Sequence, residues 1–385
     1  MNSLWTYISN GIAAFLFSST GPVAIIIAVA ATMQLSNEHV SSWLFAGFAI
    51  AGAVSLAFSI YYRQPLVFAW SIPGTVLLLG ALDHLSINEA VGAFLATGVV
   101  ILIVGIKGYA TRLLSWIPKP VVMAMVSGIF LDFGLRLISA FSVAPLMSSL
   151  MVLVFVLVTA IPVLAKSIPP ILSALIVGAV VVLMAGSTQE SPPLDRVLVS
   201  LQYFSPVFSI RAMLELVVPL AITVLMVQNA QGYAVLGQAG HQPPTKAMTN
   251  ACGMGSIVFS FLGAVSMCVT GPSNAILAAS GERQYQYIGA ITYAVLAIIF
   301  GVCGGLMAWL ALKLPESYIA VLGGLAVFKV LEGAFKSAFS GGQTLGALTS
   351  LLITVSGISL FNIGAPFWGL VFGSAVSYLL EGDNK

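Results

Sequence analysis

The sequence predicts an all-α polytopic membrane protein with fourteen membrane-crossing segments, arranged as two inverted repeats of seven. Three observations predict this fold class. The 385 residues are 59% hydrophobic and 7% charged, whereas a soluble domain carries about 25% charged residues, so the bilayer must be the solvent for most of the chain. Apolar windows long enough to span a bilayer recur along the whole length. Two further apolar stretches are broken by a proline at matching places in the two halves.

Twelve apolar windows predict full-length transmembrane helices, because a helix of about 20 apolar residues crosses the hydrocarbon core. Together they leave no polar stretch long enough for a separate soluble domain. The windows cover residues 7–31, 39–61, 87–106, 119–139, 147–165, 168–186, 212–237, 247–264, 285–311, 318–338, 344–361 and 363–380.

Two shorter apolar stretches, 66–82 and 266–281, supply segments 3 and 10. Pro73 and Pro272 interrupt them. A helix over residues 73–82 would extend about 15 Å at 1.5 Å per residue, which is half of a bilayer. The residues before each proline favour strand, and proline suits the first turn of a helix. Each stretch is therefore predicted to cross as an extended piece followed by a half-helix.

The two broken segments share one motif. Residues 71–78 read SIPGTVLL and residues 270–277 read TGPSNAIL, so a hydroxyl residue stands two places before each proline. A helix N-terminus presents unpaired N–H groups and about half a positive charge. Two such ends facing each other near the midplane would bind an anion without a formal cation. The alternative is that these residues only cap kinked helices.

The longest polar stretch, 186–211, separates seven segments from seven. The predicted organisation is a first repeat over 1–186, a linker over 187–211 and a second repeat over 212–385. An odd number of segments in each half inverts the halves relative to each other. Two further matches support the repeat at an offset of 197 residues: Val91-Gly92-Ala93 with Ile288-Gly289-Ala290, and Ile117-Pro118-Lys119 with Leu314-Pro315-Glu316.

The distribution of Lys and Arg predicts the orientation. With the N-terminus inside, nine of these residues fall on the inner side and four on the outer side. We therefore expect a multi-pass protein of the inner (plasma) membrane with both termini in the cytoplasm. The first span is expected to be retained, because the N-terminus lacks the pattern of a secretory signal.

Polar and aromatic residues beside the broken segments are the next candidates for a binding site. Gln228, Asn229 and Gln231 lie within one span, where amides are costly unless they face protein or a cavity. Their counterpart in the first half is the run 18–22. Phe68 and Trp70 share one face of the predicted extended piece. They could stack on an aromatic ligand, and core packing is the competing interpretation.

Few ionisable residues fall inside the spans. Asp132 and Lys329 are mid-span and 197 positions apart, so they could pair, or each could face an aqueous vestibule. As the only mid-span carboxylate, Asp132 is the candidate proton carrier. Glu215 and Arg211 lie near a membrane face and are predicted to be boundary residues.

The sequence gives no reason to expect catalytic, metal or redox chemistry. The cysteines, Cys252, Cys268 and Cys303, form no CxxC motif and are expected to be reduced, buried thiols. The three histidines are predicted to be surface residues in loops, without metal-ligand spacing. No catalytic motif is present. We therefore expect no enzyme activity, cofactor or metal. A net charge of +2 without a basic cluster gives no reason to expect nucleic acid.

Three motifs of the sequence resemble those of a known family. Residues 62–74 (YRQPLVFAWSIPG), 228–230 (QNA) and 365–370 (APFWGL) resemble the benzoate:proton symporter (BenE) family. That family is similar in fold to nucleobase–ascorbate transporters and sulfate permeases. The resemblance implies a core domain of segments 1–4 and 8–11 and a gate domain of segments 5–7 and 12–14. Segments 3 and 10 would hold the substrate in the core, which moves against the gate.

The sequence departs from the nucleobase carriers at two positions. Those carriers place glutamates on segments 8 and 10, where this chain has Gln228 and Ser273. Neutral amides and helix N-termini suit an anion better than a nucleobase. Proton coupling is implied by the resemblance alone.

The sequence therefore predicts a secondary active transporter that takes up an aromatic carboxylate, benzoate, with a proton by an elevator-like movement. Another organic anion, a nucleobase-like solute or a passive anion channel are the alternatives, and a homodimer is left open. The predicted substrate-binding residues are Phe68, Trp70, Ser71, Gly74, Thr75, Gln228, Asn229, Gly271, Ser273 and Asn274.

Overall fold

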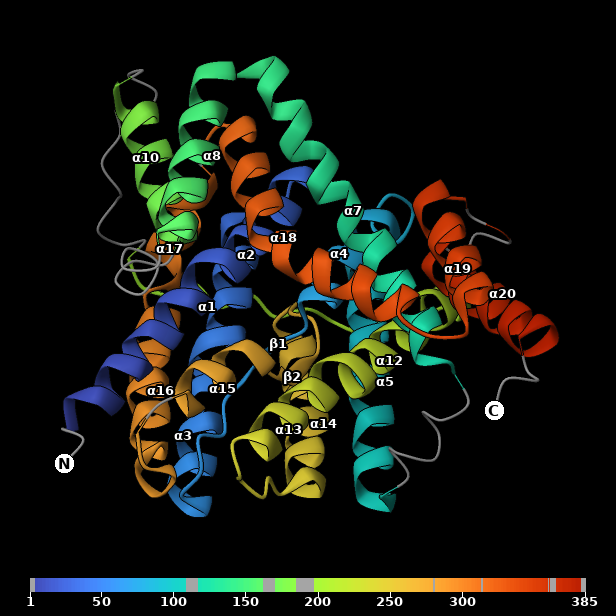
Figure 1. The fold of residues 1–385 in the computed structure, drawn as a ribbon, viewed down its shortest axis with the longest axis horizontal. Helices are drawn as coiled ribbons and strands as arrows, with labels where there is room; N and C mark the ends of the chain where they lie inside the picture. The colour runs from blue at the N-terminus through green and yellow to red at the C-terminus, as the bar shows by residue number, and fades with distance from the viewer. Residues whose placement is uncertain are drawn as a thin grey trace.

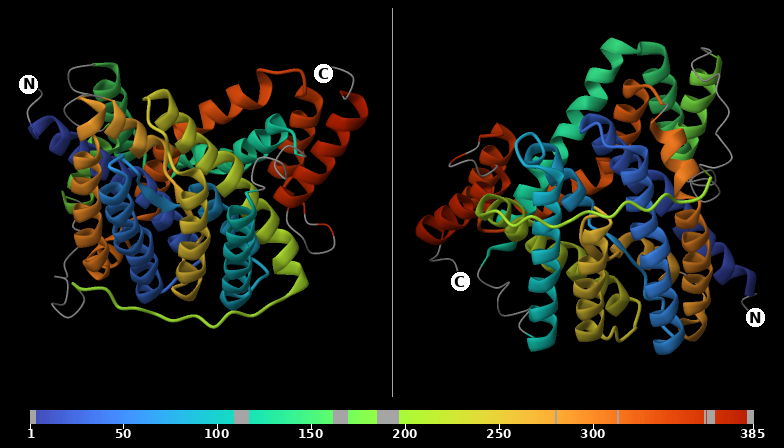
Figure 2. Two further views of the ribbon diagram at one scale, coloured as in Figure 1. Left: turned by 90° about the horizontal axis from the view of Figure 1, so that it is seen from below. Right: turned by 180° about the vertical axis from the view of Figure 1, so that it is seen from behind.

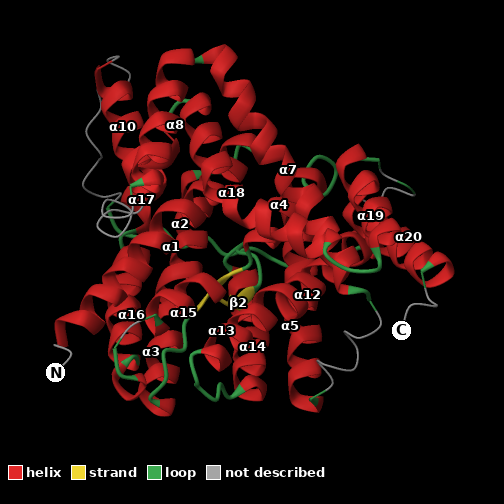
Figure 3. Cartoon of the chain, viewed as in Figure 1, coloured by secondary structure: helices red, strands yellow, loops and turns green. Residues whose placement is uncertain are grey.

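The computed structural model describes residues 4–108, 117–161, 170–184, 197–279, 281–312, 314–358, 360 and 365–381. Helices dominate this part of the chain, and two short strands lie at its centre (Figures 1 and 3). Seven of the described helices are long and apolar enough to cross a membrane, and five shorter apolar helices accompany them. The arrangement agrees with the rule that backbone in lipid must satisfy its own hydrogen bonds.

Helix is found in each of the twelve predicted windows. The helices of the first half are α1 (Leu4–Thr32), α2 (Asn37–Leu44), η1 (Phe45–Ile50), α3 (Ala51–Tyr62), α4 (Ile72–Ala81), α5 (Ile87–Lys107), α7 (Lys119–Val143), α8 (Pro145–Ala160) and α10 (Pro170–Met184). The helices of the second half are α11 (Ile210–Ala212), η3 (Met213–Val217), α12 (Val218–Ile222), η4 (Thr223–Asn229), α13 (Ala230–Gln238), α14 (Thr245–Phe261), α15 (Gly271–Ala278), η5 (Arg283–Tyr285), α16 (Tyr287–Val302), α17 (Gly304–Leu312), α18 (Glu316–Phe339), α19 (Thr344–Ser356) and α20 (Ala365–Leu380).

Two of the long spans contain π-helical turns. One runs from α2 through η1 to α3, and the other runs from α11 through α13 and contains η3 and η4. A π-helical turn adds a residue to the helical repeat and is frequent at functional sites. The sequence did not predict these turns, because hydropathy does not report which carbonyl each amide bonds.

The two extended pieces pair with each other. Strand β1 (Phe68–Trp70) lies antiparallel to β2 (Met267–Val269), with Ala69 opposite Cys268 at the centre. The half-helices α4 and α15 begin directly after these strands. The prediction of an extended piece followed by a half-helix is therefore confirmed for both segments.

Serine side chains satisfy the outer edges of this two-stranded sheet. Ser55 of α3 accepts a hydrogen bond from the Phe68 amide at 2.9 Å. Ser256 of α14 accepts one from the Met267 amide, also at 2.9 Å. A buried backbone amide without a partner is costly, so each serine closes a strand edge that has no neighbouring strand.

Small residues let the helices around the strands approach closely. A Cβ added to Gly253 of α14 would lie 2.6 Å from the Leu102 amide nitrogen of α5. A Cβ added to Gly301 of α16 would lie 2.5 Å from the Ala49 amide nitrogen of η1. Small residues at such contacts are typical of helix packing in membranes, where hydrophobic burial does not drive association.

The described part of the predicted linker, residues 197–209, is an extended strap across one end of the helices (Figure 2). Its amides at Val199, Phe204 and Val207 donate to backbone carbonyls at the ends of α16 and α14 and in α5. Ser42 of α2 accepts from the Gln202 amide at 2.5 Å. The strap therefore ties four separate helices together, and residues 187–196 of the linker lie outside the described residues.

Candidate functional site

The N-terminus of α4 is capped by its own residues. The Ser71 hydroxyl accepts a hydrogen bond from the Gly74 amide at 3.2 Å, and the Thr75 hydroxyl donates to the Ser71 carbonyl at 3.1 Å. A Cβ added to Gly74 would lie 2.6 Å from a methyl carbon of Leu220. This end of α4 is thus closed by a serine cap and packed against α12.

The N-terminus of α15 is built differently. Thr270 makes no side-chain cap, and its hydroxyl donates instead to Ser273 at 3.2 Å. The Ser273 hydroxyl lies 2.9 Å from that of Ser18 on α1, which also hydrogen-bonds to Tyr293 of α16. A chain of hydroxyls therefore surrounds this helix end, while its first amides have no cap from Thr270.

Asn274 joins α15 to the residue before β1. Its Oδ1 accepts a hydrogen bond from the Val67 amide at 3.0 Å, and its Nδ2 donates to the Val67 carbonyl at 3.3 Å. The side chain is fully buried. The sequence marked Asn274 as a substrate ligand, and the structure shows that its amide already binds backbone.

Asn229 of η4 serves β2 in a similar way. Its Oδ1 accepts from the Val269 amide at 2.8 Å, and the residue is 1% exposed. Its Nδ2 is buried and has no partner. Gln228 beside it is also buried, and the side chain of Gln231 lies over Gly271, where an added Cβ would be 2.7 Å from Gln231 Cδ. These amides therefore line the α15 end of the sheet.

Phe68 and Trp70 are packed into the protein in this structure. The ring centroid of Phe68 lies 5.0 Å from that of Phe58, and that of Trp70 lies 5.0 Å from that of Phe48. Trp70 is 2% exposed, and its Nε1 has no hydrogen-bond partner. Both rings therefore have the core contacts that the competing interpretation of the sequence expected.

Unpaired polar atoms gather around the strands. Within the described residues, Trp70 Nε1, Asn229 Nδ2 and Ser266 Oγ are buried without partners. Such groups cost free energy unless water or a ligand satisfies them. Two of the three are N–H donors, and the uncapped amides of α15 are donors as well. Asn229 Nδ2 lies at the α15 end of the sheet with the uncapped amides, where these donors can hydrogen-bond a carboxylate, whereas Trp70 and Ser266 lie at the α4 end.

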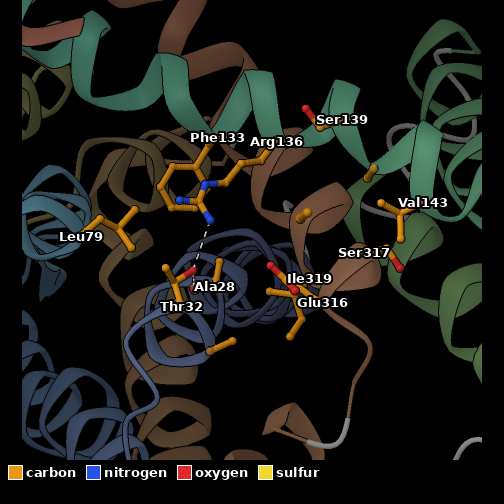
Figure 4. Close-up of a pocket in the computed structure, with 13 residues that line it drawn as sticks. Ala28, Thr32, Leu79, Phe133, Arg136, Ser139, Val143, Glu316, Ser317 and Ile319 are labelled. Atoms are coloured by element: carbon orange, nitrogen blue, oxygen red, sulfur yellow. Dashed lines mark hydrogen bonds between the residues drawn. The ribbon is translucent and has the colours of Figure 1, made fainter. Parts of the chain in front are cut away.

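Asp132 does not pair with Lys329. Its carboxylate binds Arg136 one turn along α7, with Nε–Oδ2 at 2.7 Å, and its side chain is 52% exposed. Arg136 reaches into a cavity of about 200 Å³ between α1, α4, α7 and α18, where its Nη1 donates to Thr32 at 3.4 Å (Figure 4). Asp132 therefore forms an exposed ion pair with Arg136, which lines the cavity.

The predictions for the histidines were wrong in part. His39 lies in α2 rather than in a loop, is buried and bonds the Gly263 carbonyl at 2.9 Å. His241 is also buried and bonds Gln286 at 2.7 Å. Glu215, predicted to be a boundary residue, is buried and bonds His84 at 2.8 Å. These partners are distant in sequence, and no local pattern indicates them.

A family model described as benzoate membrane transport protein (BenE) matches residues 3–379. The chain belongs to this family. The resemblance found in the sequence motifs is thereby confirmed, and the protein is a multi-pass membrane transporter of the benzoate transport family.

Two relatives in this family match nearly the whole chain. The benzoate membrane transport protein of Acinetobacter baylyi is 30% identical over 377 residues, which cover 96% of this chain and 94% of the relative. The inner membrane protein YdcO of Escherichia coli is 29% identical over 378 residues, covering 96% of this chain and 95% of the relative.

Solved structures share the fold of this BenE-family chain. The transmembrane domain of a cyanobacterium bicarbonate transporter, BicA, gives a TM-score of 0.58 at 15% identity, with 98% of both chains covered. The murine Slc26a9 anion transporter in the inward-facing state gives 0.64 at 13% identity, covering 99% of this chain and 68% of that one. At these identities the likeness concerns the fold.

Proposed function

We propose that this protein is a secondary active transporter that takes up an aromatic carboxylate, benzoate, together with a proton. The observation that carries the proposal is the pair of half-helix N-termini joined through β1 and β2, one of which has no side-chain N-cap and lies beside the unpaired Asn229 Nδ2. The relative from Acinetobacter baylyi that is 30% identical to this chain is named a benzoate membrane transport protein.

In this proposal the carboxylate binds at the start of α15. Ser273 and the amide of Gly271 donate to it, and the amides of Gln228 and Asn229 line the same end of the sheet. The dipole of α15 favours an anion there. Phe68 and Trp70 flank the aromatic ring, which requires the contacts of these rings with Phe58 and Phe48 to loosen as the substrate binds. The Ser71 end of α4, with Gly74 and Thr75, supplies the second helix dipole.

We also propose fourteen crossings in a seven-plus-seven inverted repeat, over 1–186 and 212–385 with the linker 187–211. The register of the strands supports it. Ala69 pairs with Cys268, and these positions are 199 apart, the offset of the shared proline motif. Phe68 pairs with Val269 and Trp70 with Met267, so the pairing has the pattern of a two-fold axis through the central pair.

The core and gate domains are a further part of the proposal. The core comprises α1–α5 and α11–α17 with both strands, and the gate comprises α7, α8, α10 and α18–α20. All of the strap's backbone bonds described above go to core elements, which favours a core that moves as one body. The cavity beside Arg136 lies between core helices α1 and α4 and gate helices α7 and α18. Such a boundary suits an elevator-like movement of the core.

Orientation and assembly complete the proposal. The excess of Lys and Arg on one side supports an inner-membrane protein with both termini in the cytoplasm. A homodimer is compatible with the exposed apolar faces of the gate helices, which also suit lipid. Asp132 is the less suitable proton carrier, because its side chain is 52% exposed and already paired with Arg136.

A second candidate is transport of another organic anion, or passive anion flow, on the same fold. The observation that favours it is the likeness in fold to a protein named an anion transporter. Binding of benzoate, salicylate, uracil and sulfate to purified protein separates the substrate classes. Uptake against a gradient that stops when the proton gradient is dissipated identifies a proton-coupled carrier rather than a channel.

The site itself is tested by Ser273→Ala and Gln228→Ala. A hydrogen bond to a charged group contributes about 1.5–3 kcal/mol, so each variant is expected to weaken benzoate binding about 10- to 150-fold without loss of expression. Ser142→Ala, at an exposed position on α7, is the matched control. Wild-type uptake in both site variants would refute the assignment.

A further inference from the structure

Glu215 is an unusual carboxylate for its position. Of the acidic side chains that the structure describes, it alone is buried, with 5% exposure. It lies in the π-helical turn η3 of the membrane-spanning segment Ile210–Gln238. A buried ionisable group in such a segment is costly and points to a function, and π-helical turns are frequent at functional sites.

The partner of Glu215 comes from the end of a half-helix. His84 Nε2 lies 2.8 Å from Glu215 Oε2, and the histidine side chain is 24% exposed. His84 follows α4, whose opposite end carries Ser71 at the proposed substrate site. Imidazole is the side chain whose charge ordinarily changes between about pH 5 and 8. The pair therefore joins an imidazole that solvent reaches to a buried carboxylate.

The surroundings of the pair contain further ionisable groups. The elements packed against η3 are α4, α5, α11, α12 and α20. The Arg211 charge acts on the Glu89 carboxylate, which also accepts a hydrogen bond from the Ser86 amide. Apart from His84 and Glu215, the charged or titratable residues on these elements or next to them are Asp83, Glu89, Lys107, Arg211, Tyr378 and Glu381.

We propose that the His84–Glu215 pair binds the proton that is transported with the substrate. The inference rests on the proposed function and deepens it. A proton on the pair offsets the negative charge of a bound carboxylate, so the moving core has the same net charge when it is loaded and when it is empty.

The position of the pair gives it a means of coupling to movement. Both η3 and α12 contact α20, which is a gate helix in the proposal, whereas His84 and Glu215 belong to the core. Sliding of the core along α20 changes what covers the pair. Displacement of α4 at its substrate end also moves His84 relative to Glu215, because α4 is a single rigid helix of 10 residues.

The test uses the full protein in liposomes that contain a pH-sensitive dye. The first measurement is the rate at which labelled benzoate exchanges for unlabelled benzoate without a pH gradient. The second is the rate of benzoate accumulation driven by an alkaline interior, and the dye reports the proton influx that accompanies it. The double variant His84→Gln with Glu215→Gln removes both charges and keeps an amide hydrogen bond. We expect its exchange to stay within about two-fold of wild type, while accumulation and proton influx fall at least about ten-fold.

Asp83→Asn, next to the pair and exposed, is the matched control and should behave as wild type. Wild-type proton influx in the double variant would overturn the inference, as would equal loss of exchange and accumulation in a folded variant. If the double variant does not fold, the single variant His84→Gln decides, through the number of protons taken up per benzoate bound, measured by calorimetry in buffers of different ionisation heat. An unchanged number overturns the inference. Absence of benzoate exchange in the wild type would instead refute the proposed function.

Discussion

Asn274 shows how one amide side chain can replace a missing strand. Its Oδ1 and Nδ2 bind the amide and the carbonyl of Val67, which is the pairing a neighbouring peptide group would make. The motif around Pro272 marked this residue as polar and important. Its partner lies 207 residues away in sequence, so the sequence could not distinguish a substrate ligand from a backbone ligand.

The stability of the folded protein should depend on pH through His241. Burial lowers the pKa of His241, the nearby Arg283 charge lowers it further, and the bond to Gln286 partly opposes them. Below about pH 6.5, His241 therefore binds a proton more readily in the unfolded chain than in the folded protein. Stability contributed by the neutral imidazole should be lost as the pH falls below about 6.5, by at most about 1.4 kcal/mol per pH unit. Thermal unfolding in detergent between pH 8 and 5.5 measures this loss.

His241→Gln is the comparison variant, because glutamine can still bond Gln286 and does not titrate. Relative to wild type, the variant should gain stability as the pH falls from 6.5 and show a constant difference above pH 7.5. A difference between the two proteins that does not change with pH would contradict the assignment of this dependence to His241.

The two half-helices differ at the element scale although their sequences share a motif. Ser71 caps α4, whereas Thr270 turns to Ser273 and leaves α15 without a side-chain cap. The motif predicted both helix starts, because proline and a preceding hydroxyl residue define such a start locally. It did not predict the asymmetry, because Ser18 on α1 is the partner that engages Ser273.

The close contact between α5 and α14 depends on a glycine. A Cβ at Gly253 would lie 2.6 Å from the backbone nitrogen of Leu102, and backbone cannot move aside as a flexible side chain can. Gly253→Ala should push the two helices apart and destabilise the protein by about 1–3 kcal/mol. Thermal inactivation in detergent measures the loss.

Gly80→Ala is the matched control, since nothing lies within 4 Å of a Cβ added there. This change in α4 should leave stability unchanged or raise it by about 0.4–1 kcal/mol. Equal stability of the Gly253 and Gly80 variants would show that the α5–α14 contact can relax.

At the scale of the whole molecule, the strap joins helices of the proposed core, and the cavity lies where the proposed core meets the proposed gate. The strap binds α2, α5, α14 and α16, and the cavity is lined by α1, α4, α7 and α18. Hydropathy predicted the helices well, because lipid requires every span to satisfy its own backbone. It could not predict which helices pack together, because that depends on contacts such as the backbone bond of Phe204 with Phe261, which join distant parts of the chain.

Cross-linking across the cavity tests this division. Cysteines in place of Thr32 and Arg136, joined by a short bifunctional maleimide, would tie α1 to α7, whose side chains already meet there. Transport in liposomes should fall at least about ten-fold, because the core could no longer slide against the gate. Cys303, which is partly accessible, is first replaced by serine.

The matched control places cysteines at Ser36 and Gln202, whose side chains meet at an exposed position. This link ties the strap to α2 within the proposed core and should leave transport unchanged. Full transport by the protein linked between α1 and α7 would show that these helices do not move apart.

The pairing of Ala69 with Cys268 has a consequence for the origin of such a chain. In the proposed repeat these two residues are counterparts, so a two-fold axis runs between them, and a two-fold contact is self-complementary. A half-length polypeptide would be able to make the same pairing with a second copy of itself, and such a homodimer would join two helix N-termini at its centre. Fusion of the two copies would free the two helix starts to differ, as those at Ser71 and Thr270 do.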